Sequence, residues 1–183
     1  MSRVLAKRAL IVHPDTPCDW LQGLGTKLTA LDEERIRIEY VAIGAVERIK
    51  LPLAVSADRR DGLWQTTCFE LFATDSGTAY REFNFSPSRE WAAYRFDDYR
   101  TGMVDLPLSV PRIEWARGGQ RLAVTVEVDA RAVLCSGGAA ALSAVIEETD
   151  GTKSYWALRH PSGQPDFHHR DCFQLTLEAP HAA

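Results

Sequence analysis

The sequence predicts an all-β fold, an antiparallel, jelly-roll-like β-sandwich of about ten strands with at most one short helix. Apolar and polar residues alternate with a period of two through most of the chain, as strands with one buried face require. Turn residues separate these runs at regular intervals, which is typical of a sandwich and not of strands that alternate with helices. The composition, 45% hydrophobic and 25% charged, is that of a globular protein.

The expected elements follow one another along the chain. Arg117–Gln120 and Asp150–Gly151 predict hairpin turns. Asp129 caps a single helical turn over 129–134, which Gly137 and Gly138 stop. The expected strands are 9–13, 35–43, 47–51, 63–74, 80–86, 91–97, 112–116, 121–128, 142–149, 153–159 and 172–178.

Length and charge narrow the function classes. The 183 residues contain no internal repeat or linker, so we expect a single domain over 1–183. Lys plus Arg is 21 against 25 for Asp plus Glu, a net charge of −4, which argues against a nucleic-acid partner. No apolar stretch has the length of a signal peptide core or a membrane span. We therefore expect a cytoplasmic protein with no membrane partner; the oligomeric state is left open.

The four cysteines, at positions 18, 68, 135 and 172, form no CxxC motif. In a cytoplasmic setting they should be reduced thiols. Cys68 and Cys172 lie within strand-like runs, so we expect them to be small buried side chains and not zinc ligands.

The segment 63–100 carries the most information about function. We expect its strands to bury one set of alternating residues, namely Leu63, Phe69, Leu71, Phe83, Phe85, Tyr94 and Phe96. The other set should share a second face, namely Trp64, Thr66, Cys68, Glu70, Phe72, Tyr80, Glu82, Asn84, Ser86, Trp91, Arg95 and Asp97. A merely solvated face would favour Lys, Glu and Thr over two tryptophans and an asparagine.

The register of the first two strands can be narrowed further. Residues directly opposite in an antiparallel pair share a face, so Glu70 should lie opposite either Glu82 or Asn84. Opposed like charges are unfavourable, which favours the Glu70–Asn84 pair. Trp64, six residues upstream of Glu70, should then lie on the same strand face. A carboxylate, an amide and an indole ring together suit a sugar, whose hydroxyls and apolar ring face they can bind.

Four motifs carry a resemblance to a known family. They are LWxxTCFE at 63–70, YxEFNFSPSxxWAAYxFDxYR at 80–100, SYWALxHP at 154–161 and PDFHH at 165–169. With these motifs the chain resembles the DOMON-like β-sandwich proteins, which are related to the family-nine carbohydrate-binding modules. The resemblance implies a sandwich that binds a sugar or, in other branches, haem.

In the sugar-binding modules two tryptophans enclose a terminal sugar, while Glu, Arg and Asn side chains bind its hydroxyls. The resemblance assigns Trp64, Glu70 and Asn84 to this pattern, with Trp156 as the second tryptophan. The sequence departs from the pattern at the arginine, because Glu82 stands two residues before Asn84. Arg81 or Arg95 would have to take the place of that arginine.

Structural alternatives exist for most of these residues. Trp64 and Trp156 would, as structural residues, cover an edge of the sandwich. Glu82 and Arg95 would form a surface ion pair. Trp91 would pack beneath the 94–99 loop.

The histidines and the single internal methionine bear on metal and haem binding. His168 and His169 would point to opposite sides of an extended backbone, so anchoring of a loop is favoured over a metal site. Met103 with His160, His168 or His169 would be the axial pair of a haem site, which we keep as the alternative to a protein without a cofactor.

No motif of an enzyme family is present, although Glu70 and Glu82 could act as a glycosidase pair. We therefore expect a non-catalytic binding module for a saccharide or a similar polar, ring-containing ligand. The alternatives are a haem-binding or redox DOMON module and an interaction domain without a small ligand.

Overall fold

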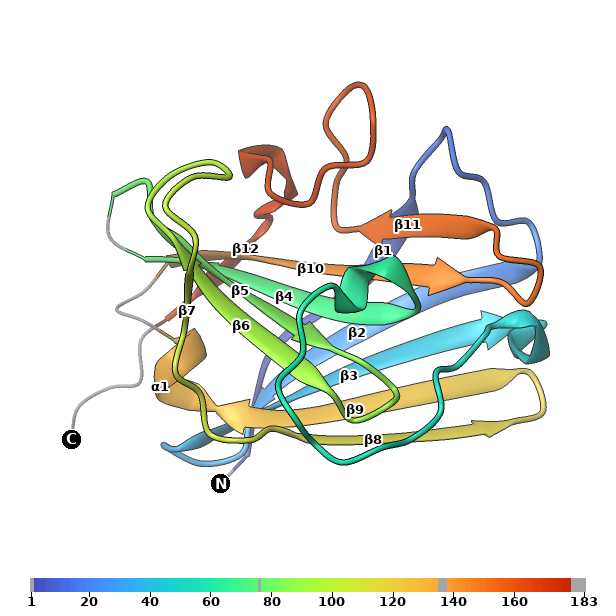
Figure 1. The fold of residues 1–183 in the computed structure, drawn as a ribbon, viewed down its shortest axis with the longest axis horizontal. Coiled ribbons are helices and arrows are strands. Elements are labelled where there is room, and N and C mark those ends of the chain that lie inside the picture. The colour runs from blue at the N-terminus through green and yellow to red at the C-terminus, as the bar shows by residue number, and fades with distance from the viewer. Residues whose placement is uncertain (1, 76, 135–137, 179–183) are drawn as a thin grey trace.

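The computed structural model describes residues 2–75, 77–134 and 138–178. Its strands form two layers, so the predicted β-sandwich is confirmed (Figure 1). The described residues contain twelve strands, more than the ten or so expected. Their one α-helix, α1 (Ala130–Val133), is the expected turn capped by Asp129.

We call the two layers sheet A and sheet B. All of their strand pairs are antiparallel. Sheet A has the order β1 (Arg3–Val12), β2 (Leu21–Ala30), β3 (Arg35–Gly44), β9 (Arg121–Asp129) and β8 (Arg112–Gly118). Sheet B has the order β7 (Val104–Asp105), β6 (Trp91–Phe96), β5 (Tyr80–Phe85), β4 (Cys68–Thr74), β10 (Gly138–Glu147) and β11 (Lys153–Ala157), and β12 (Leu175–Leu177) also pairs with β10.

One strand belongs to both sheets. The stretch of β1 from Arg3 to Leu10 pairs with β2, whereas Ile11 and Val12 pair with β11. The sandwich is therefore one curled sheet that folds over onto itself (Figure 1).

Sheet B is buried on both faces. Its inner face packs against sheet A in the main core, where the Tyr40 hydroxyl from β3 donates to the Glu70 carbonyl on β4 at 2.6 Å. Its outer face carries a second apolar cluster, which Leu63 and Phe167 from flanking segments help to cover. Other members of this outer cluster are Cys68, Phe72, Tyr80, Tyr94, Phe96 and Cys172. Because both faces are apolar, alternation along these strands does not reveal which face meets sheet A.

Several segments differ from the predictions, among them the unpredicted two-residue strand β7. The strand β2 was not predicted, because Gly23 and Gly25 interrupt its apolar residues and a bulge between Leu21 and Gly23 shifts the period. The expected strand at 47–51 is replaced by the 3₁₀ turn η1 (Val46–Arg48), and the expected strand start at 63 by the 3₁₀ turn η2 (Leu63–Gln65). None of the helices in the described part of the chain is long and apolar enough to span a membrane.

Candidate functional site

A row of small and polar side chains crosses the outer face of sheet B. Directly opposed residues join Ala92, Asn84, Glu70, Ser143 and Ala157 across five neighbouring strands. The predicted Glu70–Asn84 pairing is thus confirmed. We call this series the polar row.

Glu82 stands in the next row, beside the polar row. It lies opposite Tyr94 on β6 and Phe72 on β4. One residue, Phe83, separates Glu82 from Asn84 on β5, so Glu82 is a diagonal neighbour of Glu70. Two carboxylates and an amide therefore share one small area of the face.

The hydrogen bonds of these groups are few. Asn84 Nδ2 donates to Glu82 Oε1 at 2.7 Å, and the Ser143 hydroxyl donates to Glu70 Oε2 at 3.1 Å. No lysine or arginine among the described residues forms an ion pair with Glu70 or Glu82. The two carboxyl groups are nevertheless buried, with 2% of Glu70 and 6% of Glu82 exposed.

Burial changes the acidity of the cluster. It raises the pKa of Glu70 to about 8, an effect that the charge of Glu82 reinforces. It also raises the pKa of Glu82 to about 7. His168 Nε2 lies 3.7 Å from Glu82 Oε2, but burial and the charge of Arg100 lower the pKa of His168 to about 4. At neutral pH the imidazole is therefore uncharged and does not balance the carboxylates.

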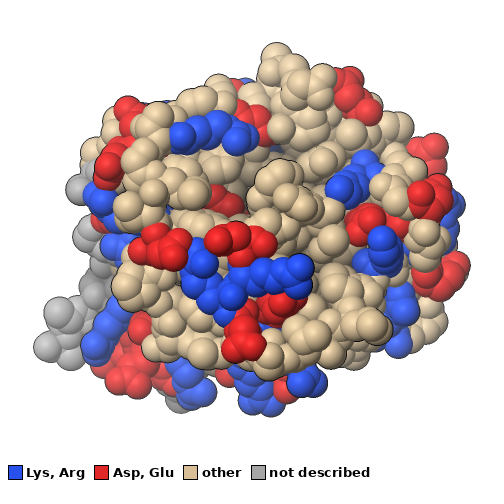
Figure 2. Space-filling view, in the orientation of Figure 1, with Lys and Arg blue, Asp and Glu red and all other residues tan. Residues whose placement is uncertain are grey.

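The second oxygen of each carboxylate remains in contact with solvent. Neither Glu70 nor Glu82 is among the described side chains with a fully enclosed, unpartnered polar atom. Each free oxygen therefore keeps a small contact with solvent. Figure 2 shows a recess with acidic atoms at its floor and charged side chains of both signs around it.

Trp64 lies at the edge of this face, on η2 and not on a strand as predicted. Gly62, with φ of 74°, lies in the left-handed region and starts the turn. Leu63 points into the outer cluster, while Trp64 is 52% exposed. The turn η2 packs against β4 and β5, the strands that carry the carboxylates.

The structure does not bring Trp91, Arg95 and Trp156 to this face. Tyr94 lies opposite Glu82, so Trp91 and Arg95 leave the other side of β6. Trp91 is buried in the main core, with its indole N–H donating to the Ala57 carbonyl at 3.3 Å. Trp156 is also in that core, 4% exposed, and donates to the Ser154 hydroxyl at 2.9 Å.

The two arginines proposed to complete a sugar site also lie elsewhere. Arg95 pairs with Asp97 at 2.8 Å and with Asp75 at 3.8 Å, and the expected Glu82–Arg95 ion pair is not formed. Arg81 pairs with Asp75 at 3.1 Å. Arg81 is next to Glu82 on β5, and Arg95 is next to Tyr94, the partner of Glu82 on β6. Both arginine side chains therefore leave the face of sheet B opposite to the polar row.

Sequence reasoning missed the loop that approaches Glu82. The PDFHH segment was expected to anchor a loop, and it does so: His168 Nδ1 lies 2.7 Å from the Tyr80 hydroxyl. Asp166 accepts hydrogen bonds from the Tyr99 hydroxyl at 2.5 Å and from Arg100 at 2.8 Å. These contacts place His168 and Arg100 beside the carboxylates, although no spacing in the sequence indicates this.

Metal and haem binding find little support in the side-chain arrangement. The described residues contain no group of three or more His, Cys, Asp or Glu side chains placed to hold a metal ion. Met103 is 59% exposed. One ring nitrogen of each of two histidines is engaged: Nε2 of His160 lies 2.8 Å from the Ile11 carbonyl, and Nδ1 of His168 lies 2.7 Å from the Tyr80 hydroxyl.

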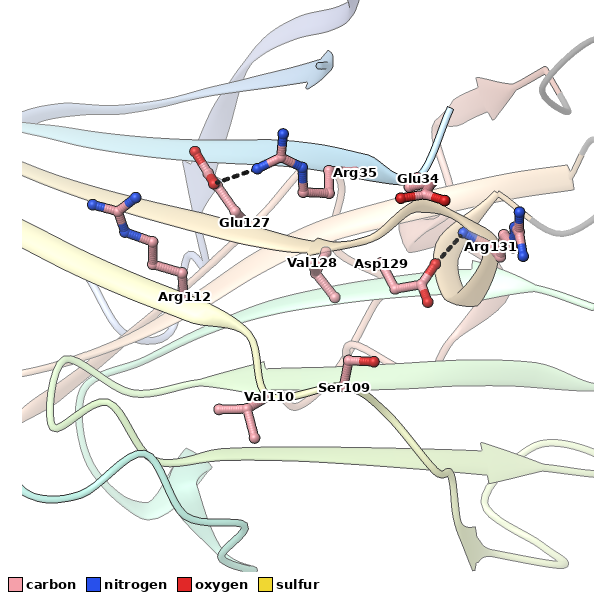
Figure 3. A pocket seen from close by; sticks show the side chains of 9 residues that line it. All are labelled: Glu34, Arg35, Ser109, Val110, Arg112, Glu127, Val128, Asp129 and Arg131. Carbon is pink, nitrogen blue, oxygen red and sulfur yellow. Dashed lines mark hydrogen bonds and ion pairs between the residues drawn. The ribbon is translucent and has the colours of Figure 1, made fainter. Parts of the chain in front are cut away.

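A hollow of about 490 Å³ lies on sheet A (Figure 3). Its charges partly compensate one another, because Arg35 lies 3.9 Å from Glu127. In addition, the backbone N–H of Arg131 donates a hydrogen bond to the Asp129 carboxylate at 2.8 Å. The lining residues are Glu34, Arg35, Ser109, Val110, Arg112, Glu127, Val128, Asp129 and Arg131. This lining has no aromatic side chain on which a sugar ring could stack, unlike the face that Trp64 borders.

Comparisons with known proteins identify the fold. The structure is similar to that of a presumed carbohydrate-binding protein from Bacteroides uniformis, with a TM-score of 0.69 and 14% identity over 96% of this chain and 87% of that one. It is also similar to a family 9 carbohydrate-binding module from Caldicellulosiruptor kristjanssonii in complex with cellotriose, with a TM-score of 0.54 and 7% identity over 98% and 84% of the two chains. No protein-family model matches the sequence, and the curated proteins give no match.

Proposed function

We propose that the protein is a binding module for a saccharide, which it holds on the outer face of sheet B. The observation that carries the proposal is the joint placement of Glu70, Glu82 and Asn84 on the outer face of sheet B, where β4 and β5 pack against η2, the turn that carries the exposed Trp64. The fold shared with the family 9 module that was solved with cellotriose supports it. A relation to the DOMON-like proteins is part of this proposal.

Each group has a role that follows from its chemistry. The half-exposed Trp64 ring offers an apolar surface for the C–H face of a sugar. The free oxygens of Glu70 and Glu82 accept hydrogen bonds from hydroxyl groups, and Asn84 holds Glu82 in place. A saccharide supplies both an apolar face and many O–H donors, which matches this combination.

The test is isothermal titration calorimetry with a panel of neutral, acidic and amino mono- and oligosaccharides. We expect at least one of them to bind, and Trp64→Ala to weaken its binding by at least tenfold, because a hot-spot aromatic contributes about 2 kcal/mol or more. The matched control is Trp115→Ala, since Trp115 is also partly exposed, at 39%, but lies on β8 of sheet A. Absence of binding across the panel at millimolar concentration, or equal losses in both variants, would overturn the proposal.

A further inference from the structure

The carboxylate cluster lacks a cation. The guanidinium of Arg100, whose charge acts to lower the pKa of Glu82, is held by Asp166 at 2.8 Å. His168, at 3.7 Å from Glu82, is the only ionisable base within ion-pair distance among the described residues. Arg81 and Arg95 lie on the other face of sheet B, paired with Asp75. Neither carboxyl group is therefore ion-paired with a lysine or an arginine of the described chain.

The cluster also has an excess of hydrogen-bond acceptors. The donors within it are already used, because the Ser143 hydroxyl donates to Glu70 and the Asn84 amide donates to Glu82. The second oxygen of each carboxylate keeps a small contact with solvent and accepts no hydrogen bond from the described residues. A ligand that enters must bring donors, and a charged N–H donor binds a carboxylate more strongly than a neutral O–H does.

We propose that the preferred ligand is an amino sugar, whose ammonium group lies between Glu70 and Glu82 while its ring rests against Trp64. The inference rests on the proposed saccharide function and names the class of sugar. An ammonium group supplies three donors and one positive charge, which fits two free carboxylate oxygens on diagonal positions of neighbouring strands. Neutral sugars would fill the same place with weaker donors.

The high pKa values of the free carboxyl groups agree with this arrangement. Burial and mutual repulsion raise the pKa of Glu70 to about 8 and burial raises that of Glu82 to about 7. A bound cation would favour the ionised form of both groups, so binding should release protons. Calorimetry in two buffers of different ionisation enthalpy measures that release directly.

The test compares four probes at pH 7 by calorimetry: a glucosamine oligomer, the N-acetylglucosamine oligomer and the cello-oligosaccharide of the same length, and ethanolamine. We expect the glucosamine oligomer to bind at least about tenfold more tightly than the two neutral oligomers, as a charge-assisted hydrogen bond predicts. Proton release should accompany only that binding. Ethanolamine should bind at least tenfold more weakly than the oligomer, because it lacks the ring.

Glu82→Gln and Glu70→Gln are the decisive variants. Each keeps the shape of the side chain and removes the charge that the carboxyl group carries when a cation is bound, so each should weaken binding of the glucosamine oligomer more than binding of the neutral oligomers and abolish most of the tenfold preference. The matched control is Glu114→Gln, an exposed carboxylate on β8. Circular dichroism and thermal melting verify that each variant is folded. If only one of the two Gln variants folds, that variant alone is sufficient for the test.

The outcomes separate the two proposals. Neutral oligomers that bind as tightly as the glucosamine oligomer would overturn this inference and leave the saccharide function standing. Binding of ethanolamine as tight as that of the oligomer would overturn the assignment to a sugar amine. If no saccharide binds, the proposed function itself is wrong, and this inference with it.

Discussion

The hydroxyl of Tyr80 and Nδ1 of His168 lie 2.7 Å apart, and this contact joins β5 to the loop that precedes β12. The same hydroxyl accepts the backbone N–H of Arg100 at 3.1 Å. One phenol group on the sheet therefore holds two loops that border the carboxylate cluster.

Removal of that hydroxyl should loosen both loops. We expect Tyr80→Phe to lower the free energy of unfolding by about 1–2 kcal/mol, because two partly buried hydrogen bonds are lost while the ring keeps its stack on Phe96. Hydrogen exchange of the Arg100 and His168 amides should speed up. The control is Tyr155→Phe, whose ring is also partly buried and whose hydroxyl has no hydrogen-bond partner in the described part of the chain. Unchanged exchange in Tyr80→Phe would contradict the prediction.

The two tryptophans assigned by resemblance should behave in opposite ways. Trp64 is 52% exposed, so Trp64→Ala should change the free energy of unfolding by less than about 1 kcal/mol. Trp156 is buried in the main core, so Trp156→Ala should cost about 3–5 kcal/mol. Urea denaturation of both variants provides the comparison. A large loss of stability in Trp64→Ala would show that the ring is a structural residue.

Stability should depend on pH through the carboxylate cluster. The pKa of Glu70 is raised from 4.5 to about 8 and that of Glu82 to about 7, so the folded chain binds these protons more tightly than the unfolded chain does. Their contribution to stability is complete below pH 4.5 and is lost as the pH rises toward 8. His168 acts in the opposite sense: its pKa is lowered from 6.5 to about 4, so its contribution is lost as the pH falls through that range.

Between pH 6.5 and pH 8 only the carboxyl contribution should change appreciably. We expect the free energy of unfolding to fall by about 1 kcal/mol or more over this range, and Glu70→Gln to remove most of the fall. Glu114→Gln, a change at an exposed site, should leave the slope as it is. A rise in stability over the same range would contradict the assignment.

Thiol chemistry offers a further check. Cys18, Cys68 and Cys172 are free and buried, and burial raises the pKa of each. They should react slowly with a thiol reagent in the native protein. After denaturation without reductant all four cysteines should react; Cys135 lies outside the described residues. Titration of two thiols or fewer would indicate a disulfide and would contradict the cytoplasmic location that we propose.

The haem alternative has a simple spectroscopic test. We expect the purified protein to be colourless and to give no sharp Soret band after addition of hemin, because Met103 is exposed and His160 and His168 are engaged in hydrogen bonds. A hexacoordinate haem spectrum that Met103→Ala abolishes would contradict this expectation.

The sequence was sufficient to predict the register of β4 and β5, but not to predict which side chains of β6 face the main core. Like-charge repulsion between Glu70 and Glu82 selected the Asn84 pairing, which is a local effect. For β6, we assumed that Tyr94 and Phe96 point toward the main core. They belong instead to the outer cluster, because loops distant in sequence cover that face. When both faces of a strand are buried, its pattern of apolar residues cannot distinguish them.

The role of Trp64 stays a prediction. Its expected place on an unbroken strand from 63 to 74 was wrong, since Gly62 takes a left-handed conformation that starts a turn. The approach of His168 to Glu82 depends on a contact across 88 residues with Tyr80, which no periodicity reports. Long-range loop placement was thus the part of the site that local patterns could not supply.

The strand shared by both sheets has a consequence for the order of events during synthesis. The last two residues of β1, Ile11 and Val12, leave the ribosome long before their partners Trp156 and Ala157. Sheet A, whose strands all lie within the first 129 residues, can assemble while that stretch of β1 waits. The pairing of β1 with β11 can form only after β11 has emerged. A nascent chain halted before that point exposes the unpaired edge of β1 to other proteins.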